Sequence, residues 1–93
     1  MAYRVVVGES AGRDIRRLPR DAQRRVVAKA EALADDPRPS GCRKLEGLEN
    51  LYRVRAGDYR IVYQIEDTIL LVLIVTIGNR RDVYERLRRM QRG

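Results

Sequence analysis

Five side chains in the second half of the chain are of types that together hold a phosphate and stack on a base. Guanidinium groups contact phosphate oxygens in a planar, bidentate way, and a tyrosine ring stacks on an unpaired base. Such a set suits a polyanion, and single-stranded RNA in particular. Its members are Arg53, Arg55, Arg60, Arg80 and Tyr84.

The overall charge agrees with a polyanionic or acidic partner. The 93 residues include 20 Lys and Arg against 13 Asp and Glu, a formal net charge of +7, and such a balance favours these partners. Eighteen of the 20 cations are arginines. A GC-rich coding bias would give the same excess, so the positions of the arginines carry the argument and their number does not.

Several kinds of chemistry are excluded by composition. The chain has no histidine and one cysteine, Cys42, so a histidine-based triad, a zinc site and an internal disulfide are out of reach. We expect no cofactor and no metal. The N-terminal residues 1–8 and the apolar run 69–77 are too short for a signal peptide and a membrane span, which predicts a cytoplasmic protein without membrane contact.

The pattern of apolar residues predicts the elements that position these side chains. Helical spacing indicates two N-terminal helices, with Ser10 as a possible N-cap of the first, and β-branched runs indicate strands. The last strand is apolar at every position except Thr76, as expected of a central strand buried on both faces. The expected ranges are a strand over 3–7, helices over 11–18 and 21–35, a long loop over 35–41, strands over 51–55, 59–65 and 69–77, and a short C-terminal helix beyond Gly78.

These elements predict an α+β fold. Two helices pack on a small, mainly antiparallel four-stranded sheet in the order strand, helix, helix, strand, strand, strand, followed by the short C-terminal helix. No repeat, linker or composition shift divides the chain, and its length suffices for one core. We therefore expect residues 1–93 to form a single domain.

The hairpin register decides which side the arginines face. Pairing Arg55 with Arg60 puts Val54 opposite Ile61 and gives one coherent apolar face. Arg53 then shares the other face with both arginines. Like charges directly opposite each other destabilise a sheet, so a compensating charge is needed. A bound phosphate, solvent and salt, or a nearby carboxylate would serve; the carboxylates concerned are Glu46, Glu49 and Asp82.

The segment after the last strand can add to this face. It leaves the sheet near the hairpin and can bring Arg80 or Arg81 and Tyr84 beside the arginines. The alternatives are a solvated polar face with no ligand and, for Tyr84, a core anchor for the C-terminal helix.

Three motifs at these positions resemble the RelE-type toxins of bacterial toxin–antitoxin modules. The motifs are Lys44–Gly47, Leu51–Tyr63 with its Gly-Asp-Tyr-Arg hairpin, and Gly78–Tyr84. The resemblance covers essentially the whole chain. It implies a single RelE-like toxin domain over residues 1–93, and an mRNA interferase that cleaves the message in the ribosomal A site. It also implies a co-expressed acidic antitoxin that wraps the toxin and can form a hetero-oligomer with it.

The resemblance also implies which residues act. Arg53, Arg55, Arg60, Arg80 and Tyr84 would be catalytic, and RNA would contact Arg81 as well as the first three. The cut would use the ribose 2′-hydroxyl as nucleophile, which needs a base, cations for the developing charge and an acid for the leaving oxygen.

The general base is where this sequence departs from the type pattern. The family's lysines are replaced here by Arg53 and Arg55, and a guanidinium rarely gives up its proton. Asn79 stands where many relatives carry a histidine. Glu46, Glu49, Tyr84 or the ribosome itself remain as possible sources of the base.

Two other functions stay open at this point. A toxin of the related ParE type would inhibit DNA gyrase, and the arginine face would then be incidental. A catalytically weak module would only bind RNA or the antitoxin.

Overall fold

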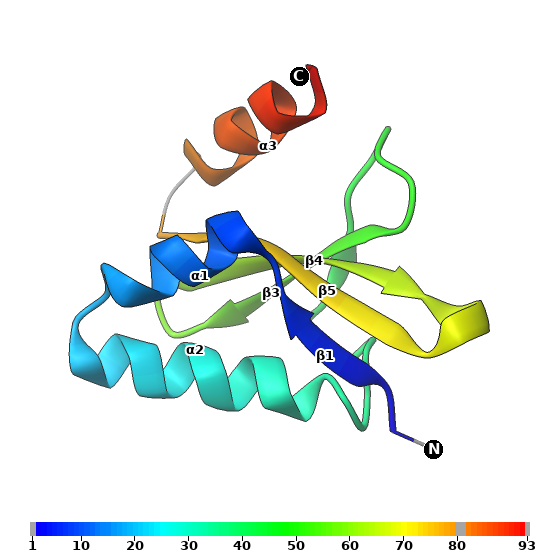
Figure 1. Cartoon of the computed structure of the whole chain (residues 1–93), viewed down its shortest axis with the longest axis horizontal. Coiled ribbons are helices and arrows are strands. Elements are labelled where there is room, and N and C mark those ends of the chain that lie inside the picture. Colours follow the sequence, from blue (N-terminus) through cyan, green and yellow to red (C-terminus); the bar gives the residue numbers. More distant parts are fainter. Residues whose placement is uncertain (1, 80–81, 93) are drawn as a thin grey trace.

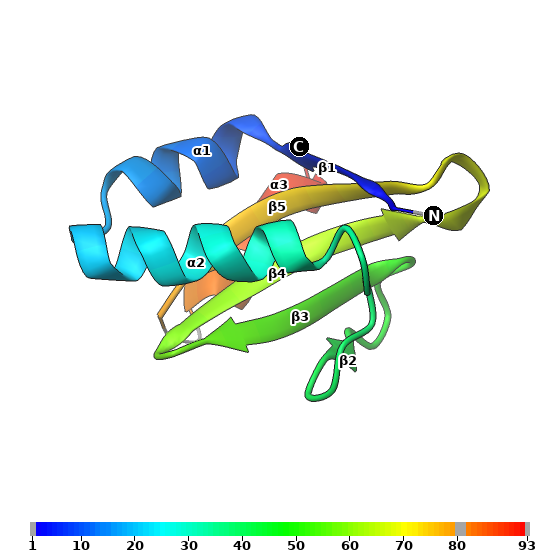
Figure 2. The same ribbon diagram turned by 90° about the horizontal axis from the view of Figure 1, so that it is seen from below.

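A computed structural model describes residues 2–79 and 82–92 of the chain. Helices α1 (Glu9–Arg16) and α2 (Arg20–Ala32) cover one face of a sheet, and α3 (Asp82–Arg92) lies against the other face (Figures 1 and 2). The fold is α+β, as predicted. Among the described residues, no helix combines the length and apolarity needed to cross a membrane.

The sheet over these described residues has five strands, one more than predicted. Their order is β1-β5-β4-β3-β2, with β1 parallel to β5 and the other pairs antiparallel. The additional strand, β2, has two residues, too few to show any alternation of apolar and polar side chains. The strands are β1 (Arg4–Val7), β2 (Arg43–Lys44), β3 (Leu51–Ala56), β4 (Tyr59–Glu66) and β5 (Leu71–Gly78), with a 3-10 turn, η1 (Asp67–Ile69), between β4 and β5.

The predicted register of the β3–β4 hairpin is confirmed. Arg55 lies opposite Arg60, and Val54 lies opposite Ile61. Gly57, at the turn, has a φ of +63°, a conformation that glycine adopts at little cost. The hairpin therefore has one apolar face and a second face that carries the arginines together with buried Leu51 and Val62.

The apolar face and the helices form the main core. Side chains of β3, β4 and β5 pack there against α1 and α2, and burial of apolar side chains of this size stabilises the fold by roughly 1.5–3 kcal/mol each. A second, smaller cluster lies under α3. The main core includes Val26, Leu33, Val54, Ile61, Tyr63 and Ile74, and the second cluster contains Leu51, Val62, Val83 and Leu87.

Some details of the predicted elements differ. Helix α1 begins at Glu9 with extended Gly8 as its N-cap, so Ser10 lies inside the helix and does not cap it. Helix α2 ends at Ala32, three residues before the predicted end. Strand β5 is an interior strand as predicted, but its alternate side chains are only half-buried. These half-buried side chains point to the face of the sheet on which α3 lies, and α3 covers only part of that face.

Candidate functional site

The three hairpin arginines emerge on the same face of the sheet, opposite α1 and α2. Arg55 is exposed, and Arg53 and Arg60 are half-buried. Strand alternation places Arg53 two positions from Arg55 and therefore on its side. The structure thus brings together the hairpin members of the predicted site.

Tyr84 reaches this face from α3. The Cζ atom of Arg60 lies 6.0 Å from the centroid of the Tyr84 ring, at the limit of a cation–π contact. The ring is half-buried and also packs against the cluster under α3. Tyr84 therefore anchors α3 on the sheet and also lies next to Arg60. Its interpretation as a core anchor and its interpretation as a member of the arginine site are compatible.

The path of the chain after β5 agrees with the prediction. Gly78 lies opposite Arg60 in the β4–β5 register, so the segment leaves the sheet beside that arginine. Arg80 and Arg81 lie outside the described residues, and the side chain of Asp82 is not described either. The roles predicted for Arg80 and Arg81 stay predictions.

Arg43 is a basic residue of this face that the sequence interpretation missed. In the β2–β3 register it lies directly opposite Arg53, and its side chain is exposed. The loop between the strands is closed by a 2.9 Å hydrogen bond from the amide of Leu45 to the carbonyl of Leu51. The sequence feature that could have identified Arg43 was its position as a basic residue just before the loop that leads into β3. We call Arg43, Arg53, Arg55 and Arg60 the arginine face.

Among the carboxylates whose side chains the structure describes, which leaves out Asp82, none forms an ion pair with the arginine face. The ion pairs that these residues form are Arg13–Glu9, Arg38–Asp67 and Arg86–Asp14. Glu46 and Glu49 are exposed in the β2–β3 loop and pair with none of the face arginines. The two glutamates therefore do not supply the counter-charge, the expectation for Asp82 lies outside the described side chains, and no described carboxylate occupies the like-charged pairs.

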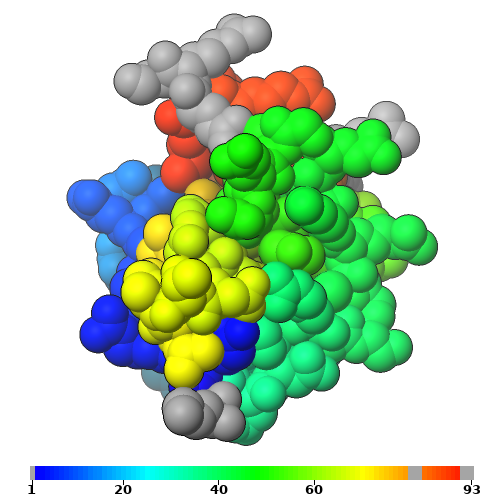
Figure 3. All heavy atoms as spheres, turned by 90° about the vertical axis from the view of Figure 1, so that its right-hand side faces the viewer, coloured from blue at the N-terminus to red at the C-terminus, as the bar shows by residue number. Residues whose placement is uncertain are grey.

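The β2–β3 loop forms a hollow beside the face. A space of about 650 Å³ is lined by residues 44–49, which include both glutamates. Leu45 and Leu48 pack against the cluster under α3, which places the loop on the same side of the sheet as the arginines. Figure 3 shows this loop, in green, next to the helix, in red.

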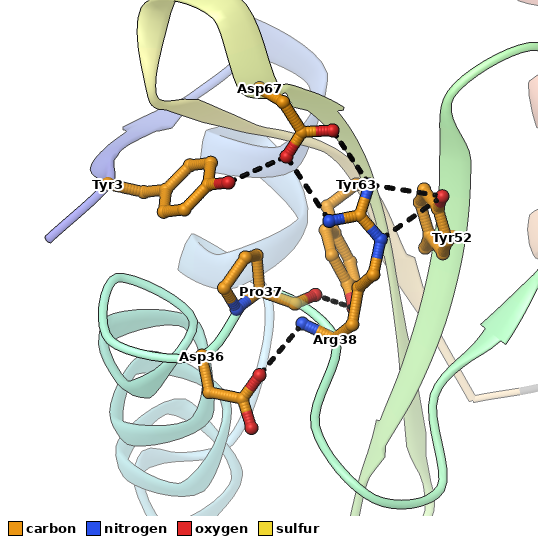
Figure 4. A network of polar contacts seen from close by, with 7 residues as sticks. All are labelled: Tyr3, Asp36, Pro37, Arg38, Tyr52, Tyr63 and Asp67. Atoms are coloured by element: carbon orange, nitrogen blue, oxygen red, sulfur yellow. Dashed lines mark hydrogen bonds and ion pairs between the residues drawn. The ribbon is translucent and has the colours of Figure 1, made fainter. Parts of the chain in front are cut away.

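A polar network fixes the chain that leads to β2 (Figure 4). The Nη2 atom of Arg38 lies 2.9 Å from Asp67 Oδ2, and the Tyr52 hydroxyl accepts hydrogen bonds from Arg38 Nε and Nη2 at 3.3 Å. The Tyr3 hydroxyl donates to Asp67 Oδ1 at 2.6 Å. Hydrogen bonds from Arg38 and then from Tyr3 lower the pKa of Asp67 to about 2. The network joins the α2–β2 loop, β3 and η1.

A second network holds α3 on the sheet. Arg86 Nη1 donates to Asp14 Oδ1 at 2.8 Å, and Thr76 Oγ1 and the amide of Ile77 donate to Asp14 Oδ2 at 3.0 Å. The Arg86 Nη2 atom also donates to the Ile77 carbonyl at 2.8 Å. Ile77 lies in the part of β5 that has passed the end of β1. The buried carboxylate therefore ties α1, β5 and α3 together.

The arrangement can bind and stabilise negative charge. Fixed guanidinium donors aimed at a developing oxyanion lower the energy of a transition state. The four arginines of the face are poor proton acceptors. Carboxylates accept protons more readily, and the β2–β3 loop at the side of the face carries two of them, Glu46 and Glu49.

Comparison with known proteins identifies relatives along most of the chain. Residues 5–84 match the family described as ParE toxin of the type II toxin–antitoxin system. A putative RelE-like toxin protein of Escherichia coli is 34% identical over 90% of this chain and 92% of its own. The mRNA interferase toxin RelE of Escherichia coli K12 is 30% identical, over 86% and 85% of the two chains.

Solved structures show the same fold. The archaeal RelE–RelB complex from Pyrococcus horikoshii contains a chain with a TM-score of 0.76 and 30% identity, which covers 87% of this chain and 98% of that one.

Proposed function

The chain belongs to the RelE/ParE family of type II toxins, and we propose that it is a ribosome-dependent endoribonuclease that cleaves mRNA in the A site and so inhibits translation. The observation that carries the proposal is the arginine face, where like-charged pairs lie without a partner among the carboxylate side chains that the structure describes. A relative named mRNA interferase supports the same substrate.

The proposed reaction uses no metal. The ribose 2′-hydroxyl loses its proton and attacks the adjacent phosphate to form a 2′,3′-cyclic phosphate, while the bond to the 5′-oxygen breaks and that oxygen takes up a proton and leaves as a 5′-hydroxyl. The arginines stabilise the charge on the phosphoryl oxygens. We assign the catalytic roles to the two sheet strands and the C-terminal segment. The residues are Arg53, Arg55, Arg60, Arg80 and Tyr84, with Arg81 as a further RNA contact.

The proton at the 2′-hydroxyl needs an acceptor other than arginine. Glu46 and Glu49 in the β2–β3 loop are the candidates, because their carboxylates are exposed beside the face. A carboxylate within one water molecule of the ribose would suffice.

The proposed partner is an acidic antitoxin. A formal net charge of +7 favours an acidic protein, and the solved relative is described as a RelE–RelB complex. We propose that the two proteins form a hetero-oligomer in the cytoplasm, where the ribosome and the message are found, and that residues 1–93 act as one toxin domain.

Translating ribosomes provide the test. Purified protein added to a translation extract should create new 5′ ends within codons, detected by primer extension on a defined message. The double variant Arg55→Ala/Arg60→Ala is the matched control and should create few. Saturating protein that leaves the message intact would contradict the nuclease.

Inhibition of DNA gyrase is the second candidate, because the matching family is described as ParE toxin. A supercoiling assay with the same protein distinguishes the two activities. Loss of supercoiling with intact mRNA would favour the gyrase target. If the protein neither inhibits supercoiling nor cleaves mRNA, a module that only binds RNA or the antitoxin is favoured.

A further inference from the structure

We propose that Arg43 and Arg53 form a second phosphate subsite, which holds a phosphate of single-stranded RNA next to the one that is cleaved. The identity of the ligand as message rests on the proposed function. The subsite itself rests on the pairing of β2 with β3.

The register places the two guanidinium groups together. Arg43 is directly opposite Arg53 in an antiparallel pair, where side chains project to the same face with Cβ atoms about 5 Å apart. Arg55 and Arg60 form a second opposed pair two positions further along β3. The arginine face thus consists of two neighbouring like-charged pairs.

The charge of the first pair is open to a ligand. Arg43 is exposed, Arg53 is half-buried, and neither forms an ion pair with a described carboxylate. Two guanidinium groups in this relation repel each other. A phosphate between them replaces the repulsion with two charge-assisted hydrogen-bonding contacts.

The position of Arg43 is built into the fold. Two rungs connect β2 to β3, and the amide of Cys42 donates to the carbonyl of Pro39 at 3.0 Å. Upstream, Arg38 is tied to Asp67 and to the Tyr52 hydroxyl (Figure 4). The hydrogen-bonded α2–β2 loop thus fixes the position of Arg43 at the edge of the sheet.

The ligand that fits is a single strand. From Arg60 on β4 to Arg43 on β2 the face crosses two strand spacings, about 10 Å, which exceeds one phosphate group. The hollow of about 650 Å³ is lined by residues 44–49, which follow Arg43 directly in the chain, and has space for a base. An unstacked strand presents both its phosphates and its bases to such a surface.

Equilibrium binding tests the subsite without any cleavage. The probe is a fluorescein-labelled oligoribonucleotide with 2′-O-methyl groups throughout, which blocks the nucleophile, and its affinity is measured by anisotropy over a range of salt concentrations. One lost phosphate contact on a single strand reduces the slope of log K against log salt by about 0.7, which is about fivefold in affinity at 0.1 M salt. Arg43→Ala should show both changes, and Arg43→Lys should retain most of the slope.

Arg24→Ala is the matched control. It removes one positive charge from an exposed position of α2, on the opposite side of the sheet, and should leave the slope unchanged. Arg43→Gln, which keeps most of the side-chain length, should behave as Arg43→Ala. Unfolding midpoints close to that of the wild type show that the variants are folded.

The outcomes separate the subsite from the nuclease. Equal slopes for Arg43→Ala and Arg24→Ala, or no binding of the probe by the wild type, overturn the subsite. A wild type that leaves translated mRNA uncut contradicts the nuclease, while the slopes still decide whether Arg43 contacts a phosphate.

Discussion

Arginines with carboxylate partners and arginines without them occupy different places in this protein. Arg86 and Arg38 pair with Asp14 and Asp67, whereas the arginine face has no such partner among the carboxylate side chains that the structure describes. The paired arginines connect segments 72 and 29 positions apart in the chain. They stabilise the fold, and the unpaired ones remain available to a ligand.

The contrast shows that composition alone does not identify a binding surface. All these residues add to the same excess of charge. Their environment divides them: buried Asp14 pairs with one arginine and exposed Asp67 with another, whereas the sheet register brings the four arginines of the arginine face together.

The largest expected effect is on stability, at Asp14. Asp14→Ala removes the partner of Arg86 and the acceptor for Thr76 and Ile77. Loss of one member of a buried pair costs about 3 kcal/mol, because the remaining charge stays uncompensated. Urea unfolding measures the change. Glu9→Ala, which breaks the exposed pair with Arg13, should change stability by less than about 0.5 kcal/mol, and equal losses in the two variants would contradict the contrast.

Arg60→Ala should show the opposite behaviour, with a loss of activity and little loss of stability. One missing donor to the oxyanion costs about 3 kcal/mol, or 10²- to 10³-fold in the rate of cleavage. Removal of the charge relieves the repulsion with Arg55 and forfeits the contact with Tyr84, two small effects of opposite sign. The rate is measured by primer extension and the stability by urea unfolding. Cleavage at the wild-type rate would remove Arg60 from the site.

A smaller gain in stability is expected at Arg55. Arg55→Gln removes the like charge opposite Arg60 and should raise the free energy of unfolding by about 0.5 kcal/mol at low salt. The gain should disappear in concentrated salt, which screens exposed charges. Arg24→Gln, with the same loss of charge on α2, is the control. If both variants gain equally, net charge and not the opposed pair is the cause.

The smallest effect concerns Asp67 and acid. Its pKa is lowered from 3.8 to about 2 in the folded state, so its contribution is present above pH 4 and is lost as the pH falls toward 2. The pair with Arg38 is exposed, which limits its strength. Between pH 4 and 2 the wild type should therefore lose stability more steeply than Asp67→Asn, and the two should converge below pH 2. Parallel curves would show that the pair contributes nothing.

The sequence predicted the hairpin better than its surroundings. Alternation and the Ala-Gly-Asp turn were enough to place Arg55 opposite Arg60, because a one-residue slip would mix the two faces. Strand β2 carries no such pattern in its two residues, so Arg43 was missed. The partners Asp14–Arg86 and Arg38–Asp67 depend on how distant elements pack, which local periodicity does not encode.

The parallel pairing of β1 with β5 has a consequence for the biosynthesis of the chain. Residue 4 lies opposite residue 71, so the first strand cannot pair with its neighbour until residues 71–74 have left the ribosome. The β3–β4 hairpin is local and can form earlier, but an isolated hairpin is only marginally stable in water. Contacts so far apart in sequence also close slowly. A nascent chain therefore carries its basic hairpin before it has a complete sheet to support it, and the sheet is completed only after β5 has been synthesised.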